Sequence, residues 1–273
     1  MKSPRPPLRI GIVGYGTAGQ AAALLLARDG HHVEACERAP VLGPVGAGFL
    51  VQPSRLAVLW ELGLLDEALA HGARIGRLYG ETATGRAVMD MRYRELAPHF
   101  FGLGMQRGAL FGLLDNAWGE GRRVHCGRRI VKVDAARGLL RDEQGEEHGA
   151  FDVVIAADGA ASVLRGAIAA PTLDRPYPWG AQWCLVAQDA WEFPDELRQR
   201  YVGARRMAGL LPVGTRPGDP VPRLSFFWSV PAAELQNAGR DEAAWRADVG
   251  AVWPEAAGCL RTTAVPSGLA QGR

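Results

Sequence analysis

The sequence has few of the features that mark disulfide-bonded, metal-binding or membrane-spanning proteins. It contains 4 cysteines in 273 residues, namely Cys36, Cys126, Cys184 and Cys259. They lie far apart, form no CxxC pair and have no histidine at ligand spacing, so we expect reduced thiols and no metal site. No apolar run reaches the roughly 18 residues needed to cross a bilayer, and the opening MKSPRPPLR has no apolar core. These absences predict a cytoplasmic protein without a transmembrane segment.

An excess of charge of either sign is also missing. The chain has 31 Lys and Arg against 29 Asp and Glu, a net charge of +2 at pH 7, and its basic residues are spread along it. This pattern gives no sign of a nucleic-acid partner. The six histidines show no spacing typical of a base, a nucleophile or a metal ligand, and we interpret them as structural or exposed. With 48% hydrophobic residues, the chain can bury a substantial core.

The most informative segment is the opening LRIGIVGYGTAGQAAALLLARDGHHVEACER. It predicts an apolar strand, a glycine-rich turn, an Ala/Leu-rich helix and a second strand, which is the order of a dinucleotide-binding βαβ unit. In such a unit Gly14 permits the tight turn, Gly16 lets the backbone approach a pyrophosphate, and Gly19 lets helix and strand pack closely. The N–H groups and the dipole at the helix start would hold the negative charge. The predicted cofactor residues of this turn are Gly14, Gly16, Thr17, Ala18 and Gly19.

An acidic residue, Glu37, ends the second strand, close to the position about 20 residues beyond the glycines where such units carry one. Its carboxylate can accept both ribose hydroxyls and would repel a 2′-phosphate, so the predicted nucleotide is NAD or FAD rather than NADP. Arg38, next along the chain, is either a cofactor contact or a solvated charge. A βαβ turn without a nucleotide is the alternative interpretation of the whole segment.

The middle of the chain departs from a simple βαβ repeat. Residues 41–49 (VLGPVGAGF) have no periodicity and predict a loop, while the next segment predicts a helix with Ser54 as N-cap and Gly63 at its end. Residues 75–91 predict a hairpin. The apolar run at 151–157 predicts a buried strand that returns the chain to the first sheet.

The last third predicts strands at 180–188, 206–213 and 223–230, followed by a helix over 242–252. Gly218-Asp219-Pro220 predicts a turn, and the ending PSGLAQGR predicts a polar tail. Aromatic residues in this part either form core or line a pocket for a flat substrate. They are Trp179, Trp183, Trp191, Phe226, Phe227 and Trp228.

Four motifs in order resemble the group A flavoprotein monooxygenases, the para-hydroxybenzoate hydroxylase-like family that includes aromatic and polyprenyl-phenol hydroxylases. They are the opening fingerprint ending in Glu37-Arg38, the loop Gly46-Ala47-Gly48, the isolated Arg107 ahead of a Leu-rich helix, and AADGAASVLR at residues 156–165. The last matches the family pattern DGxxSxxR at Asp158, Gly159, Ser162 and Arg165, and it is more discriminating than the glycines alone.

The resemblance implies a role for each of these residues. Gly14, Gly16 and Gly19 would cradle the FAD pyrophosphate and Glu37 would hold the adenosine ribose. Residues 46–48 would lie beside the flavin part of the cofactor, and Arg107 would contact its ribityl-pyrophosphate part. Asp158 and Gly159 would serve FAD placement and NAD(P)H approach, although Asp-Gly is also a common turn with its own backbone reason.

The resemblance also implies a fold and a division of the chain. The fold is α/β, with a Rossmann-like FAD-binding domain of the glutathione-reductase type, an inserted and mostly antiparallel β substrate domain, and a C-terminal truncation. The expected division is 1–74 for the FAD-binding βαβ unit and following helices, 75–100 for a substrate-domain hairpin insertion, 101–172 for the return to the FAD-binding domain, and 173–273 for the β-rich substrate domain.

The implied activity is hydroxylation of an aromatic or quinone-like small molecule, with FAD as cofactor, NADH or NADPH as co-substrate, and O₂ activated as a flavin C4a-hydroperoxide. We consider a homodimer as the assembly of this chain. The family's further GD segment, followed by AAH-like residues, is absent from this sequence, which is expected to weaken FAD binding and to uncouple the reaction. Two alternatives remain, namely a truncated non-catalytic FAD-binding remnant and an NAD-dependent dehydrogenase.

Overall fold

The computed structural model describes residues 6–43, 46–168, 170, 173–189, 191–235, 242–260 and 268–271. The chain divides into two compact units. Unit 1 comprises Met1–Pro44, Phe111–Arg175 and Arg273, and unit 2 comprises Val45–Leu110 and Pro176–Gly272. Each unit is therefore assembled from chain segments that lie far apart in the sequence.

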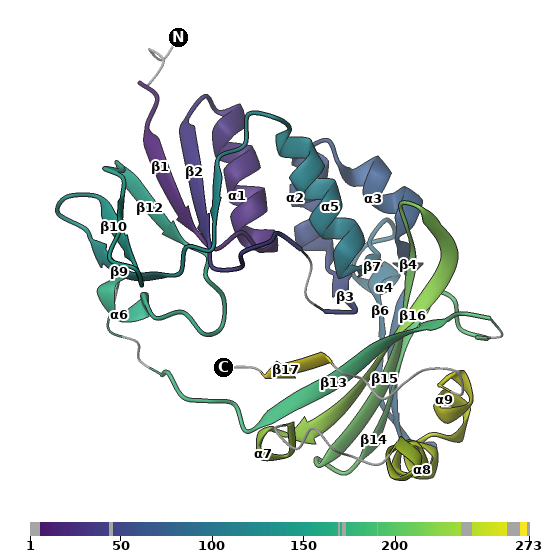
Figure 1. Ribbon diagram of the computed structural model, residues 1–273. Coiled ribbons are helices and arrows are strands. Elements are labelled where there is room, and N and C mark those ends of the chain that lie inside the picture. The colour runs from purple at the N-terminus through teal and green to yellow at the C-terminus, as the bar shows by residue number, and fades with distance from the viewer. Residues whose placement is uncertain are drawn as a thin grey trace. The chain divides into compact units, whose positions relative to one another are not determined.

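Unit 1 is built on a parallel sheet whose strands follow the order β12-β1-β2-β8 (Figure 1). β1 (Arg9–Val13) pairs with β12 (Val153–Ala156) on one side and with β2 (His32–Glu37) on the other, and β8 (Val124–Cys126) pairs with β2. α1 (Thr17–Arg28) connects β1 to β2 and packs on the sheet with its buried side chains. Because all four strands are parallel, their carboxyl ends meet at one edge.

The turn after β1 is fixed by a cluster of aromatic rings. The ring of Tyr15 is 1% exposed, stacks on Trp118 at 5.8 Å and meets the edge of Phe111 at 6.2 Å. Its hydroxyl donates to Asp115 over 2.9 Å. Burial and this carboxylate raise the pKa of the Tyr15 phenol, so the hydroxyl stays a hydrogen-bond donor at neutral pH.

A small antiparallel sheet completes unit 1. It consists of β9 (Ile130–Asp134), β10 (Leu139–Asp142) and β11 (Glu147–His148), with β10 in the middle. Its buried side chain Leu140 belongs to the same apolar cluster as Phe151, whose ring lies against Gly11 of β1. A short helix, α6 (Arg165–Ile168), follows β12 along the chain.

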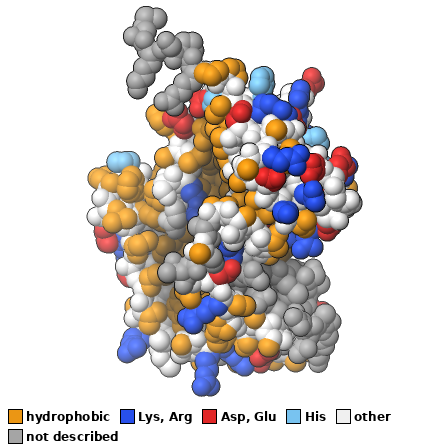
Figure 2. All heavy atoms as spheres, turned by 90° about the vertical axis from the view of Figure 1, so that its left-hand side faces the viewer, with side chains coloured by type: hydrophobic (Ala, Val, Ile, Leu, Met, Phe, Trp, Pro, Cys, Tyr) orange, Lys and Arg blue, Asp and Glu red, His pale blue; other side chains and the backbone are white. Residues whose placement is uncertain are grey.

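Hydrophobic side chains also reach the surface of unit 1. Val153 is 41% exposed, Val163 54% and Ile168 68%. Hydrophobic side chains among charged ones are visible on one face of the molecule in the space-filling view (Figure 2).

Unit 2 contains a seven-stranded mixed sheet in which most neighbours are antiparallel and β14 is parallel to β5. Its strands, in spatial order, are β17 (Gly268–Gln271), β13 (Trp179–Ala187), β16 (Asp219–Pro231), β15 (Arg206–Arg216), β14 (Glu196–Val202), β5 (Arg77–Thr82) and β6 (Ala87–Arg92).

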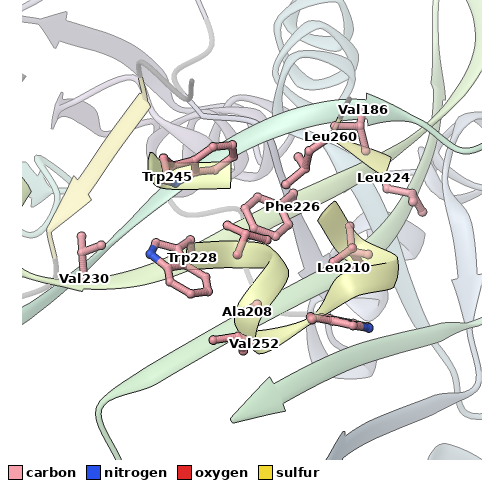
Figure 3. Packing of buried hydrophobic residues seen from close by; sticks show 13 residues of the cluster. Val186, Ala208, Leu210, Leu224, Phe226, Trp228, Val230, Trp245, Val252 and Leu260 are labelled. Carbon is pink, nitrogen blue, oxygen red and sulfur yellow. The ribbon is translucent and has the colours of Figure 1, made fainter. Parts of the chain in front are cut away.

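Helices α8 (Glu242–Val252) and α9 (Pro254–Cys259) cover one face of this sheet. Trp245 of α8 is fully buried and meets the ring of Phe226 edge-on at 5.9 Å (Figure 3). Trp228 lies in the same cluster and is 2% exposed. Two of the aromatic residues considered as pocket or core are therefore core.

The opposite face of the sheet carries a second apolar cluster, which includes Leu211 and Val213 of β15 and Ile75. A three-stranded sheet in the order β3-β7-β4 belongs to the same unit. The remaining described elements of the segment up to residue 118 are β3 (Gly48–Val51), α2 (Pro53–Glu61), α3 (Leu65–His71), β4 (Ala73–Ile75), α4 (Tyr93–Leu96), β7 (Gly102–Gln106) and α5 (Arg107–Trp118); the short α7 (Ala232–Leu235) follows β16.

Several predicted elements are confirmed and others are wrong. The hairpin is β5 and β6, and the predicted turn at Gly218 connects β15 to β16. The predicted N-cap Ser54 is wrong, because α2 begins at Pro53 with Gln52 as its N-cap residue, and proline suits the first helical position. The loop prediction fails for its last two residues, since β3 begins at Gly48 and pairs with β7.

The C-terminal prediction also needs correction. The expected polar tail contains β17, which pairs with β13. Among the described residues, no helix is both long and apolar enough to span a bilayer.

Candidate cofactor site

The turn between β1 and α1 forms an open cradle in unit 1. Gly14 has φ of +95°, and a Cβ built there would lie 2.5 Å from the carbonyl oxygen of Ala157. A Cβ on Gly19 would fall on the Gly14 carbonyl oxygen, so both positions require glycine for the fold itself. A Cβ on Gly16 would meet no atom within 4 Å. The space beside Gly16 is therefore left free by the protein.

The first turn of α1 faces this space with backbone donors. Gly16 is the N-cap residue, and no side chain caps the helix. Thr17 and Ala18 are exposed at this end, and their N–H groups have no carbonyl partner within the helix. The N-terminus of a 12-residue helix is thus available to an anion.

Glu37 lies at the carboxyl end of β2, next to the same turn. Its Oε2 accepts a hydrogen bond from the backbone N–H of Tyr15 over 2.7 Å, and its Oε1 accepts one from the N–H of Ala39 over 2.9 Å. Each carboxylate oxygen keeps a further lone pair for a ribose hydroxyl. The residue therefore orders the turn as well as offering acceptors to a ligand.

A cavity of about 230 Å³ opens at this edge of the sheet. Its wall contains three arginines, Arg38, Arg128 and Arg129, of which Arg38 is exposed and has no ion-pair partner among the described residues. The predicted site residues that line it are Gly14, Gly16, Glu37, Arg38, Asp158 and Gly159.

Sequence reasoning missed Arg128 and Arg129. They follow β8, and the N–H of Arg128 donates to the carbonyl of Glu37 over 2.8 Å. The order of the strands could have pointed to these two arginines. The residues that follow each parallel strand lie at the edge of the sheet where β1 and β2 also end.

The segment after β12 folds back on itself through the other two residues of the DGxxSxxR pattern. Gly159 has φ of +83°. The Ser162 hydroxyl accepts a hydrogen bond from the N–H of Leu164 over 3.2 Å, and Arg165 donates to the carbonyl of Ala160 over 2.6 Å while pairing with Asp174 at 3.0 Å. Ser162 and Arg165 thus hold the turn that presents Asp158 and Gly159 to the cavity.

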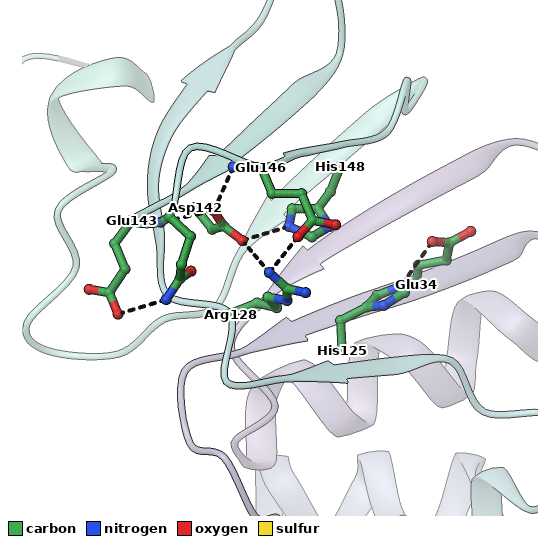
Figure 4. A network of polar contacts seen from close by, with 8 residues as sticks. Glu34, His125, Arg128, Asp142, Glu143, Glu146 and His148 are labelled. Carbon is green, nitrogen blue, oxygen red and sulfur yellow. Dashed lines mark hydrogen bonds and ion pairs between the residues drawn. The ribbon is translucent and has the colours of Figure 1, made fainter.

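Arg128 is held by a polar network around the buried carboxylate of Asp142 (Figure 4). One guanidinium nitrogen lies 3.1 Å from Asp142 and 2.5 Å from Glu146, and His148 lies 3.1 Å from the same Asp142 oxygen. Burial disfavours the charged form of Asp142, but hydrogen bonds from His148, the Glu146 amide and Arg128 outweigh it, and the pKa of Asp142 is lowered. The carboxylate therefore fixes Arg128 at the wall of the cavity.

The same three side chains, Asp142, Glu146 and His148, bring potential metal-ligand atoms within 4.8 Å of one another. The guanidinium of Arg128 binds both carboxylates and supplies the positive charge that a metal would bring. The cluster is explained as an ion-pair network.

The remaining predicted site residues belong to unit 2. The N–H of Arg107 donates to the carbonyl of Ala47 over 3.0 Å, and β3 starts at Gly48 opposite Gln106. Gly46 has φ of +112°, and a Cβ there would overlap the side chain of Arg107. The guanidinium of Arg107 lies 5.1 Å from the ring centre of Phe49. The glycine loop and Arg107 are thus built as one local structure.

The parallel sheet, the glycine turn and the acid at the end of β2 define a Rossmann-type nucleotide-binding fold joined to a β-rich unit. Residues 8–267 match a family of FAD-binding domains. The chain belongs to this family.

Curated relatives of this chain are named as monooxygenases and hydroxylases. The chain is 35% identical over 172 residues to 3-amino-4-hydroxybenzoate 2-monooxygenase of Streptomyces cremeus, covering 59% of this chain and 42% of that protein. It is 27% identical over 251 residues to the FAD-dependent urate hydroxylase of Klebsiella oxytoca, covering 87% and 61%. It is 29% identical over 165 residues to 6-hydroxynicotinate 3-monooxygenase of Bordetella bronchiseptica, covering 58% and 42%. The matched part spans about half the length of these relatives.

Solved structures share the fold. A crystal structure of 2-methyl-3-hydroxypyridine-5-carboxylic acid oxygenase superimposes with a TM-score of 0.78 at 22% identity, covering 97% of this chain and 70% of that one. PqsL of P. aeruginosa in complex with 2-aminobenzoylacetate gives a TM-score of 0.72 at 23% identity, covering 98% and 74%.

The residues present fit FAD. The free space beside Gly16 is the place where a pyrophosphate approaches the backbone in such a turn, and the unpaired N–H groups of α1 and the cation of Arg38 suit its charge. The acceptors of Glu37 suit the ribose.

Proposed function

We propose that this chain forms the FAD-binding part, together with a β-rich substrate unit, of a monooxygenase that hydroxylates an aromatic or quinone-like small molecule with NADH or NADPH and O₂. The observation that carries the proposal is the cradle beside Gly16, which no protein atom fills and which lies between a helix N-terminus and the Glu37 carboxylate. The names of the curated relatives, which are hydroxylases and monooxygenases of aromatic or heteroaromatic compounds, support the reaction class.

Each predicted residue has a task in this proposal. The N–H groups of Thr17 and Ala18 bind the pyrophosphate, because they have no partner within α1. Glu37 accepts the ribose hydroxyls while its two amide bonds keep it in place. Arg38 balances the phosphate charge from the wall of the cavity, while Arg128, whose charge is taken up by Asp142 and Glu146, shapes that wall.

Asp158 and Gly159 border the same cavity and orient the cofactor there. In unit 2, Gly46, Ala47 and Gly48 shape the loop against which Arg107 is held, and the Arg107 guanidinium binds a phosphate or ribityl oxygen. FAD, when bound, supplies the electron transfer from NAD(P)H and the activation of O₂. The protein contributes binding, orientation and exclusion of water. The homodimer and the cytoplasmic location stay predictions.

The visible spectrum of the purified chain tests the proposal. FAD is added first, then NADH or NADPH under air together with an aromatic acid such as 3-hydroxybenzoate. A yellow protein that bleaches with reductant and consumes O₂ is expected. Hydrogen peroxide without hydroxylated product would indicate a flavin site open to water. Uptake of FAD without oxidation of NAD(P)H would favour the non-catalytic FAD-binding remnant, and a chain that takes up no FAD and consumes no NAD(P)H would refute the proposal.

A further inference from the structure

A second cavity lies entirely within unit 2 and contains none of the predicted cofactor residues. Its volume is about 610 Å³, within the range of small-molecule sites. It is formed where β14 and β5 meet the loop before β14 and the end of α9. Tryptophan and phenylalanine rings and two arginines stand in its wall, namely Trp191, Phe193, Trp253, Arg198 and Arg200.

The register of the sheet explains why these arginines share one face. Arg198 pairs with Leu210 and Arg200 with Ala208, and both partners point into the apolar cluster beneath α8 and α9. Successive strand residues alternate between faces, so both arginines lie on this helix-covered face. The apolar face of the sheet therefore continues on β14 as a charged surface, which borders aromatic rings in the cavity wall.

Arg200 is engaged at both terminal nitrogens, while its buried Nε has no hydrogen-bond partner among the described residues. Its two terminal nitrogens lie 2.5 Å from Glu81 and 3.3 Å from Glu255, and its guanidinium lies 5.2 Å from the ring centre of Trp253. These contacts close one side of the cavity, where the single positive charge of Arg200 is shared between the two carboxylates.

Arg198 is engaged on one edge alone. Its guanidinium lies 3.5 Å from the ring centre of Phe193 and 4.5 Å from that of Tyr79. Its Nε pairs with Glu196 at 2.7 Å, and that carboxylate is shared with Arg77 at 3.1 Å. No hydrogen bond or ion pair from the described residues reaches its two terminal nitrogens. The aromatic rings fix the guanidinium while leaving a fork of N–H donors for a ligand.

The rings beside this fork form an aromatic wall. Trp191 meets Phe193 at 5.5 Å and Trp253 at 5.9 Å, both in edge-to-face geometry. A planar ring packs well against such a wall, and a carboxylate matches the fork of Arg198 with two parallel hydrogen bonds. The carboxylates of Asp189 and Glu192 also border the cavity, but both residues are exposed and water screens their charge.

We propose that this cavity is a binding site for a small aromatic carboxylate, with Arg198 as the carboxylate anchor and Trp191, Phe193 and Trp253 as the surface for the ring. This proposal does not depend on the proposed hydroxylation. Its test measures binding without FAD and without turnover.

The test is a titration of the ¹⁵N-labelled chain with benzoate, followed through the indole N–H signals of Trp191 and Trp253. Each signal is assigned by a tryptophan-to-phenylalanine variant. Both signals are expected to shift and saturate together. Arg198→Ala should weaken this binding by about ten-fold or more, the size expected for a lost charge-assisted fork. Arg198→Lys keeps the charge without the fork, so its affinity for benzoate should lie between those of wild type and Arg198→Ala. This variant keeps the test informative if the alanine variant fails to fold.

Arg216→Ala is the matched control. Arg216 lies in the same unit, its side chain is 56% exposed, it pairs with Asp219 at 3.6 Å, and it is outside the cavity wall. The affinity of the Arg216→Ala variant for benzoate should equal that of wild type. Three results would each overturn the proposal. The first is an affinity of Arg198→Ala for benzoate equal to that of wild type, and the second is no shift of the two signals up to about 10 mM benzoate, well above a typical weak-ligand Kd. The third is tighter binding of benzylamine than of benzoate.

Discussion

The carboxylate of Glu37 holds the backbone of Tyr15, with Oε2 2.7 Å from the Tyr15 amide nitrogen. Sequence reasoning assigned this acid to a ribose, yet it also fixes the turn in which Gly14 and Gly16 lie. The two tasks are compatible because the N–H groups occupy one lone pair on each oxygen. Replacing Glu37 should therefore affect both the fold and the ligand.

Glu37→Ala leaves two backbone N–H groups without their acceptor. We expect the free energy of unfolding to fall by about 2 kcal/mol, the size of lost hydrogen bonds to a charged group, and FAD affinity to fall about ten-fold with the lost ribose acceptors. Urea denaturation and FAD titration measure the two effects.

Glu34→Ala, on the same strand, is the control for that change. Glu34 pairs with His125 at 3.2 Å and with the exposed Arg123 at 3.5 Å. Such surface pairs contribute little, so its stability should stay within about 0.5 kcal/mol of wild type. If Glu37→Ala were as stable as Glu34→Ala, the structural task of Glu37 would be disproved.

Gly16→Val places a branched side chain in the free space of the cradle. Its backbone, at φ −74° and ψ −177°, accepts a β-branched residue, and no protein atom lies within 4 Å of the new Cβ. FAD affinity should drop by at least about 100-fold, or roughly 3 kcal/mol, while the melting temperature stays close to wild type.

Gly121→Val is matched to it, because a Cβ at Gly121 also meets nothing within 4 Å and its φ needs no glycine. That variant should bind FAD as wild type does. Retained FAD affinity in Gly16→Val would show that the pyrophosphate does not lie in the cradle.

Gly46→Ala should act through Arg107. The added Cβ would overlap the Arg107 side chain, and φ of +112° disfavours any L side chain. We expect Gly46→Ala and Arg107→Ala each to weaken FAD binding by about ten-fold. The double variant should be little weaker than either, because both changes remove the same positioned guanidinium. Calorimetric titration of FAD on the four proteins measures the coupling, and fully additive losses would contradict a shared role.

Asp142→Asn should change how stability depends on pH. The folded-state pKa of Asp142 lies below its ordinary value of 3.8, so the charged side chain stabilises the fold above that value and this contribution is lost as pH falls through the lowered pKa. Wild type should therefore be more stable than Asp142→Asn at neutral pH, and the two should converge below about pH 3.

Urea midpoints between about pH 7 and pH 2, the range in which carboxyl groups titrate, measure that convergence. Glu120→Gln, at an exposed position, should follow wild type at every pH. A stability difference that stays constant across the range would exclude titration of Asp142 as its cause.

Local patterns predicted much of unit 1. The strand, turn, helix and second strand of the opening occur as β1, α1 and β2, and the apolar run before Asp158 is β12. β1 and β12 are predictable because strands of parallel sheets are apolar runs. The expectation that the strand before Asp158 is buried is wrong, since Val153 is 41% exposed and the other three residues of β12 are only partly buried. Arg128 escaped prediction because its place depends on which strand lies beside β2, a long-range property that no local pattern carries.

The β-rich unit was predicted less completely for a related reason. β14 has the sequence ELRQRYV, whose charged residues hide the alternation. In the structure these charges form ion pairs across strands, Glu196 with Arg77 and Arg200 with Glu81. Ion pairs between neighbouring strands therefore support this face of β14 in place of apolar packing. Gln52 rather than Ser54 is the N-cap residue of α2, because Pro53 needs no N–H partner at the first helical position.

The pairing of Ile10 with Val153 sets the order in which the parallel sheet of unit 1 can be completed. Strand β12 follows β1 along the chain only after α1, β2 and all of β3 to β11. Until then one edge of β1 is unpaired and open to other strands. Contacts of such sequence separation form slowly. The edge of β1 that β12 will cover is therefore exposed until β12 is available, which makes β1 the place where chaperone contact during folding should be sought.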